Sequence, residues 1–175
     1  MEKQIYLTTK YLDKSKFGIN LCLFDASGQY FELMKKNGIQ ITELKSKGTG
    51  RYYTDRYESL KDIIKLYRPH IIHSFSHMPG VLACIAGMNS RAKVIFSPRV
   101  RRKRGVFIHY SGLNYLLGIF LTGIAAKKAD KIVSNSKNVL KEFGYKEGKG
   151  DVYAHIRNGI EMVSETIDKR ALLKM

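Results

Sequence analysis

Histidine, serine and arginine side chains gather where two apolar stretches of the chain end. The segment His-Ser-Phe-Ser-His occupies positions 73–77, directly after an apolar run, and Ser97 and Arg99 follow the next apolar run. A guanidinium group donates two parallel hydrogen bonds to a phosphate, so Arg99 suits an anionic ligand. The alternatives are a hydrogen-bonded core histidine at His73 and a solvated loop charge at Arg99. The residue types therefore predict an anion-binding site, and the surrounding elements decide whether the side chains can meet.

Helices and strands alternate along the predicted chain. The periodicity and the helix-stop signals predict helices at 2–13, 30–36, 55–67, 113–128 and 136–143, with a further apolar helix ending near Gly87. Apolar runs predict strands at 17–24, 39–44, 70–74, 92–96, 131–134 and 151–156. Crossovers of this length imply a parallel, doubly wound α/β sheet with helices on both faces. In such a sheet, ligands bind at the carboxyl ends of the strands, where 73–77 would lie.

The chain begins with a helix, whereas a sheet of this type begins with a strand. In the strand order 3-2-1-4-5 the first strand lies in the middle of the sheet. We therefore expect a Rossmann-like sheet that lacks its first strand and has a hole in its place. Such a sheet would expose apolar edges, which predicts a loose fold or aggregation.

Composition gives one outlier, the net charge of +16 over 175 residues. Hydrophobic and charged fractions of 44% and 26% are those of a globular protein. The charge predicts an anionic partner, such as nucleic acid, acidic lipid or a phosphorylated substrate. Cys22 and Cys84 lie in apolar runs, so we expect reduced, buried thiols and no zinc site. No secretory signal is visible, and the longest apolar run, 113–126, is shorter than the ~20 residues of a membrane span.

Three motifs carry a family resemblance. RPHIIHSF at 68–75 resembles the RPDIVHTH segment of glycosyltransferase family 4. AKKADKIVSNS at 126–136 resembles ARLADRIVANS of that family, and VYAHIRNGIE at 152–161 resembles VHVIPNGID. Their order and spacing match, and the likeness covers nearly the whole chain.

This resemblance implies the GT-B architecture of two Rossmann-like domains, the first binding the acceptor and the second the nucleotide-sugar. Residues 1–162 would be the acceptor domain, and 163–175 would begin the interdomain linker. The resemblance further implies metal-independent transfer to a glycan or lipid-linked acceptor, by a peripheral enzyme on the cytoplasmic face of the plasma membrane. We expect the chain to be truncated at both ends, inactive alone, and without catalytic residues or cofactor, because the donor-binding domain is not in it.

The predicted acceptor cleft combines residues from four strand ends. Its members are His73, Phe75, His77, Ser97, Arg99, Asn135, Ser136, Asn158 and Gly159. We expect His77 to be exposed, and the helix after it could offer free N–H groups to an anion. In simpler interpretations, Asn135 and Ser136 cap a helix and Asn158-Gly159 forms a turn.

A basic run, Arg101, Arg102, Lys103 and Arg104, precedes the apolar helix at 113–128. Basic residues beside exposed apolar ones suit an acidic membrane surface, at ~1 kcal/mol per residue. Alternatives are a solvated charge run, a membrane-surface subunit of another enzyme, and a non-catalytic nucleic-acid-binding module. No RNA-binding motif and no stacking face of aromatics are visible, so we do not expect nucleic acid to be the partner.

Overall fold

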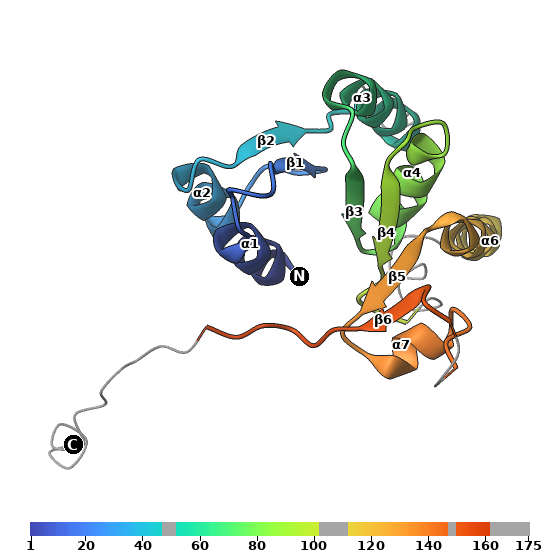
Figure 1. Cartoon of the computed structure of the whole chain (residues 1–175). Helices are drawn as coiled ribbons and strands as arrows, with labels where there is room; N and C mark the ends of the chain where they lie inside the picture. Colours follow the sequence, from blue (N-terminus) through green and yellow to red (C-terminus); the bar gives the residue numbers. More distant parts are fainter. Residues whose placement is uncertain (47–51, 102–111, 147–149, 162–175) are drawn as a thin grey trace, which may run out of the picture.

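A computed structural model describes residues 1–46, 52–101, 112–146 and 150–161 of the chain (Figure 1). The helices are α1 (Glu2–Tyr11), α2 (Gln29–Lys36), α3 (Tyr52–Tyr67), α4 (His77–Gly87), α6 (Gly112–Lys128) and α7 (Lys137–Lys141). The strands are β1 (Asn20–Leu23), β2 (Gln40–Glu43), β3 (Ile71–Phe75), β4 (Lys93–Ser97), β5 (Lys131–Ser134) and β6 (Tyr153–His155). Every element predicted in these ranges is present, so the α/β alternation is confirmed. The largest shifts are in β1, which begins three residues later than predicted, and α3, which begins three residues earlier.

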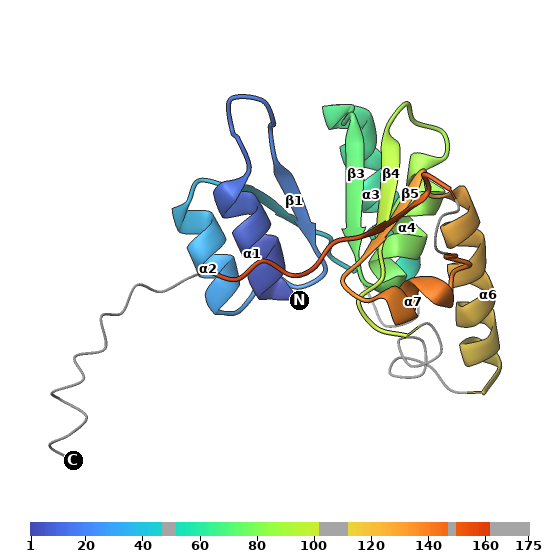
Figure 2. The same ribbon diagram turned by 60° about the horizontal axis from the view of Figure 1, so that its bottom comes forward.

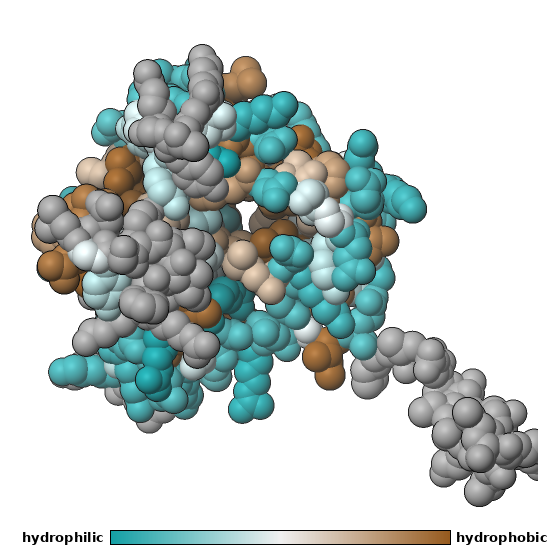
Figure 3. Space-filling model, turned by 180° about the vertical axis from the view of Figure 1, so that it is seen from behind, coloured by the Kyte–Doolittle hydropathy of each residue, from teal (hydrophilic) through white to brown (hydrophobic). Residues whose placement is uncertain are grey.

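The strands form two separate parallel sheets. Among the described residues β1 pairs with β2 alone, and the second sheet has the order β3-β4-β5-β6. The open edge of β1 faces the open edge of β3 across the middle of the molecule (Figure 1). A space-filling view shows an opening that passes through the molecule (Figure 3). The predicted Rossmann-like sheet with a hole at its centre is therefore confirmed; we call the space between β1 and β3 the strand gap.

The four-stranded sheet has a closed core on one face. Val94 and Phe96 point from β4 toward α4, where they pack with Ala125 of α6 and Leu140 of α7. Phe96 and Leu140 have no exposed surface. α4 approaches the sheet closely at Gly80, because a Cβ there would lie 2.2 Å from the Phe96 ring. Three helices are thus packed onto the same face of this sheet.

The opposite face of the same sheet is exposed at β3. Alternation along a strand sends Ile71, His73 and Phe75 away from α4, and Ile71 is 50% exposed. We predicted a buried strand at 70–74, and this is wrong for its outward face. The reason is that β3 is an edge strand whose second face carries no packed helix among the described residues.

The two-stranded sheet is less buried than the four-stranded one. All four residues of β1 are half-buried, and α1 packs against α2 on the side of the molecule opposite to α3, α4 and α6 (Figures 1 and 2). Side-chain hydrogen bonds join this part to helix α3. Arg56 of α3 is 6% exposed and donates a hydrogen bond of 3.1 Å to the Phe24 carbonyl, while the side chains of Gln40 and Tyr67 are 2.6 Å apart.

Helix α6 buries small residues and exposes large ones. Thr122 and Ala125 are buried, whereas the exposed apolar residues form a stripe, which we call the α6 stripe: Leu116, Leu117, Phe120 and Ile124. The large apolar side chains of this helix, which was predicted at 113–128, therefore point outward. Across the described residues, no helix is both long and apolar enough to span a bilayer. Cys84 is buried and Cys22 half-buried, and both are free thiols, as predicted for their reduced state although Cys22 is not fully buried.

Candidate functional site

Side chains from three strand ends meet at the carboxyl edge of the four-stranded sheet. His73 Nε2 and Ser97 Oγ share a hydrogen bond of 2.8 Å, and the His73 ring stacks on Phe75 at 4.3 Å between centroids. The Arg99 guanidinium lies over the Phe75 ring at 4.9 Å and donates to Asn158 Oδ1 at 3.1 Å. We call these five residues the His73 cluster. The sequence predicted all five, and the structure brings them together.

The electrostatics of the cluster keep His73 neutral. Desolvation and the positive charge of Arg99 lower the pKa of His73 to about 4. His73 as a whole is exposed on the open face of β3, and the desolvation acts at its ring nitrogen, which is held against Ser97, a residue with no exposed surface. Burial also lowers the pKa of Arg99, although it remains a cation. The site therefore pairs a neutral hydrogen-bonding imidazole with a partly desolvated positive charge.

Two buried polar atoms near this edge have no hydrogen-bond partner within the described part of the chain. They are Arg99 Nε, which is a donor, and Asn135 Oδ1, which is an acceptor. Buried polar groups are nearly always paired, and each exception calls for an explanation. A ligand with both acceptor and donor groups, such as a phosphorylated or hydroxylated molecule, would satisfy both types of atom.

The remaining predicted cleft residues lie at a helix start or form backbone contacts. Ser136 begins α7 by position, but its side chain makes no capping hydrogen bond, so the predicted cap is wrong for Ser136. The backbone carbonyl of Asn135 lies 3.3 Å from His155 Nε2, within hydrogen-bond distance. Gly159 is held by Gln4 of α1, with hydrogen bonds of 2.9 and 3.0 Å in both directions. Sequence reasoning missed Gln4, because nothing local signals a contact across 155 positions.

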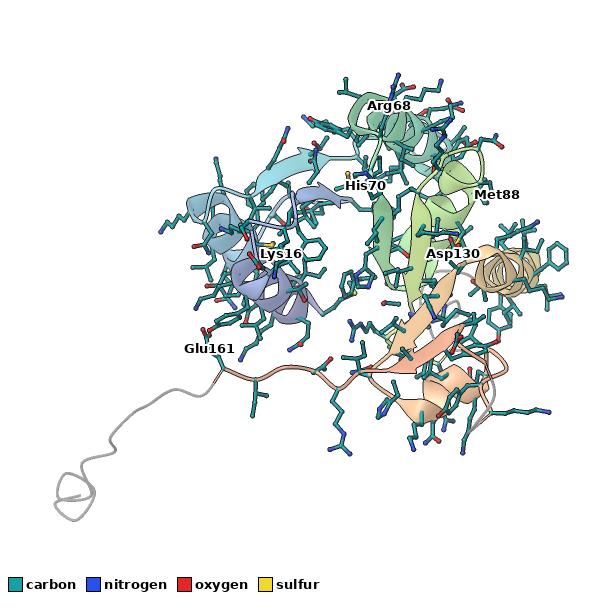
Figure 4. The ribbon with its side chains drawn as sticks, viewed as in Figure 1. Lys16, Arg68, His70, Met88, Asp130 and Glu161 are labelled. Atoms are coloured by element: carbon teal, nitrogen blue, oxygen red, sulfur yellow. The ribbon has the colours of Figure 1, made fainter. Side chains whose placement is uncertain are left out.

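The tail after β6 is also tied to α1 at its far end. Glu161 accepts hydrogen bonds of 2.5 Å from both Lys10 Nζ and Tyr11 Oη, and its label lies beside α1 in Figure 4. These contacts lower the pKa of Glu161. The tail therefore crosses from β6 past the His73 cluster to the two-stranded part.

His77 does not belong to this site, which corrects the prediction that it is exposed. It is 1% exposed, and its ring packs against Phe96 and Phe143 at 6.3 and 6.1 Å. Its Nε2 lies 3.0 Å from the Val100 carbonyl. The first turn of α4 packs into the core, which turns this histidine away from the open face of the sheet.

The predicted basic patch is described only at its first residue. Arg101 is exposed and its Nε lies 3.7 Å from Glu142. Arg102, Lys103 and Arg104 lie outside the described residues, as does the predicted linker at 163–175.

Asp130, which belongs to the motif at 126–136, has a structural role in the sheet. Its carboxylate accepts hydrogen bonds of 2.8 Å from the Val94 amide and from Lys93 Nζ, which lower its pKa. Its label lies between β4 and β5 in Figure 4. Among the residues that the structure describes, no three His, Cys, Asp or Glu side chains group as metal ligands.

Comparison with known proteins supports the fold. No family model and no curated protein matches the sequence. Among solved structures, HepE from Anabaena, determined in complex with UDP and glucose, matches at a TM-score of 0.64 with 17% identity. The match covers 91% of this chain and 41% of HepE, so this chain spans less than half of that protein. At this identity the likeness establishes a shared α/β, Rossmann-like fold.

Proposed function

We propose that this chain is the acceptor-binding part of a glycosyltransferase, with the nucleotide-sugar bound by a domain outside residues 1–175. The observation that carries the proposal is the His73 cluster at the carboxyl edge of a parallel sheet, the position at which α/β sheets bind ligands. The fold likeness to HepE, whose structure holds UDP and glucose, supports the reaction class. The three motifs that resemble glycosyltransferase family 4 support the finer assignment.

The chemistry of the cluster favours an acceptor that carries phosphate. Arg99 has an unpartnered Nε, stacks on Phe75 and donates from Nη1 to Asn158. A guanidinium group recognises phosphate more strongly than a neutral hydroxyl, since charged hydrogen bonds are about twice as strong. A lipid-linked phosphate acceptor therefore fits better than an uncharged glycan. His73, which is neutral at pH 7, would orient an acceptor hydroxyl without competing for the anion.

Calorimetry with geranyl phosphate, a short mimic of a lipid phosphate, tests this proposal. Arg99→Gln should raise Kd at least tenfold, because a lost hydrogen bond to a charged group costs about 1.5–3 kcal/mol. The matched control is Arg91→Gln, an exposed arginine remote from the cluster, which should leave Kd unchanged. UDP-glucose should not compete. Equal losses in both variants, competition by UDP-glucose, or sugar transfer by residues 1–175 alone would contradict the proposal.

The α6 stripe favours a second role, contact with an acidic membrane surface. Leu116, Leu117 and Phe120 are each more than half exposed, and Lys127 and Lys128 end the same helix. Apolar side chains insert below the headgroups while basic ones contact anionic lipid. This placement would put the enzyme at the inner face of the plasma membrane, near a lipid-linked acceptor.

Sedimentation with vesicles of phosphatidylglycerol or phosphatidylcholine tests the membrane role. We expect binding to phosphatidylglycerol vesicles that falls several-fold with Leu116→Ser plus Phe120→Ser. Leu66→Ser is the control, because Leu66 is 74% exposed but lies on α3. Binding that is equal for both lipids, or equally reduced by the control, would remove this role.

A further inference from the structure

The strand gap presents backbone hydrogen-bonding groups from both of its sides. The His70 carbonyl and the Ser76 amide bond to β4, and alternate residues of a strand point to opposite edges. The amides and carbonyls of Ile71, His73 and Phe75 therefore point into the gap.

The opposite side of the gap follows from the same alternation. The Leu23 carbonyl accepts from the Leu44 amide of the chain segment that extends β2, so Asn20 and Cys22 direct their backbone groups into the gap. Within the described ranges, neither β1 nor β3 has a second strand partner. Two facing open edges of this kind are a template for one added strand.

The side chains around the gap indicate what that strand would be made of. β1 is half-buried along its whole length, and Ile71 on the other side is 50% exposed. Brown, apolar atoms are visible at the rim of the opening in Figure 3. The strands of parallel sheets are rich in Val, Ile and Leu, so we expect the added strand to be apolar as well.

The direction of the strand follows from where α1 begins. Gln4 is bonded to Gly159, next to Asn158 of the His73 cluster. The amino end of α1 therefore lies at the carboxyl edge of the four-stranded sheet, and Figures 1 and 2 both place the N-terminus beside that end of the gap. A strand parallel to β3 would end close to Met1.

We infer that the strand gap binds one extended apolar strand, parallel to β3, donated by a polypeptide segment outside residues 1–175. Its length would match its neighbours, which have four residues in β1 and five in β3. A second copy of this chain is a poorer donor, because every described strand is already paired within its own sheet. This inference does not depend on the proposed sugar transfer.

Amide hydrogen exchange measured by NMR tests the inference with the peptide Lys-Val-Ile-Val-Val-Gly-Lys as the probe. Exchange should slow at least tenfold at the gap-facing amides, which are those of Asn20, Cys22, Ile71, His73 and Phe75. The β4-facing amides of Ile72 and Ser74 should change much less. The control peptide has Pro in place of the central Val, which removes a ladder donor, and should give no protection.

Three results would overturn the inference. The first is no protection with the peptide, and the second is equal protection with the proline peptide. The third is protection that appears without peptide as the protein concentration rises, which would assign the gap to a second copy.

A tethered form guards against a probe peptide that aggregates before it binds. Val-Ile-Val-Val followed by Gly-Ser-Gly, placed ahead of Met1, should raise Tm by about 4 °C or more and protect the same amides. The same tether with Pro at its second position should leave Tm unchanged. An equal rise for both tethers, or no rise with either, would contradict strand insertion.

Discussion

The two sheets of this molecule are built from the same strand–helix–strand units, but the side chains with almost no exposed surface are concentrated in one of them. Phe96, Ile132 and Leu140 of the four-stranded part have 0–1% of their surface exposed. The strand residues of β1 are all half-buried. Both parts border the strand gap, and the difference is that α4, α6 and α7 form one hydrophobic cluster with β4 and β5 in the four-stranded part. Because burial stabilises a fold, we expect most of the stability to reside in the four-stranded part.

Truncating an aromatic core residue should affect the two parts most unequally. Phe96→Ala should lower the free energy of unfolding by about 3–5 kcal/mol, since it removes a large buried ring and leaves a cavity. Leu23→Ala in β1 should cost less than half as much, because Leu23 is only half-buried. Urea unfolding followed by circular dichroism measures both. Equal losses would show that the two parts are equally packed.

Adding a single methyl group tests the difference in packing between the two parts by overfilling a site instead of emptying it. Gly80→Ala should destabilise the protein by about 1–3 kcal/mol, despite the higher helix propensity of alanine, because its Cβ meets the Phe96 ring. Gly18 precedes β1 and has no atom within 4 Å of its Cβ position. Gly18→Ala should therefore be neutral in the same urea titration, and a loss at Gly18 that matches the loss at Gly80 would refute the comparison.

Arg56 is a buried charge that joins the two parts. Removing it should lower the stability of the two-stranded part more than that of the four-stranded part. Arg56→Met loses the hydrogen bond to the Phe24 carbonyl and the stacking on the Phe24 ring at 5.0 Å. We expect the free energy of opening of β1 and β2 to fall by about 1–3 kcal/mol. Hydrogen exchange should show faster amides there and little change in β4 and β5. Uniform acceleration across both sheets would mean that they open as one unit.

The smallest predicted effect is electrostatic and concerns His73 alone. Because its folded pKa, about 4, lies below the ordinary 6.5, the unfolded chain binds more protons between these values. Stability should therefore fall as pH drops from 6.5 toward 4, and His73→Gln should remove that part of the slope. Arg99→Gln should raise the pKa of His73 in an NMR titration. An unchanged pKa in Arg99→Gln would leave burial as its only cause.

Local sequence patterns predicted the order of elements and the meeting of the His73 cluster. Parallel strand ends share one edge, so the spacing of His73, Ser97 and Arg99 after apolar runs was sufficient. Local patterns could not place His77, whose burial depends on Phe143, an aromatic residue 66 positions later in the chain. They also could not reveal Gln4, which meets Gly159 only because the tail returns to α1. Contacts between distant segments follow from packing, which periodicity does not encode.

The most direct test of the central claim, that the His73 cluster binds an anionic acceptor, is the pKa of His73 measured with and without geranyl phosphate. Arg99 contributes to lowering this pKa, so an anion bound to Arg99 should offset its charge and raise the value from about 4 toward 6.5. A matched titration with geraniol, which has no phosphate, should leave it unchanged. If geranyl phosphate binds while the pKa of His73 stays the same, the acceptor lies elsewhere and the proposed site is wrong.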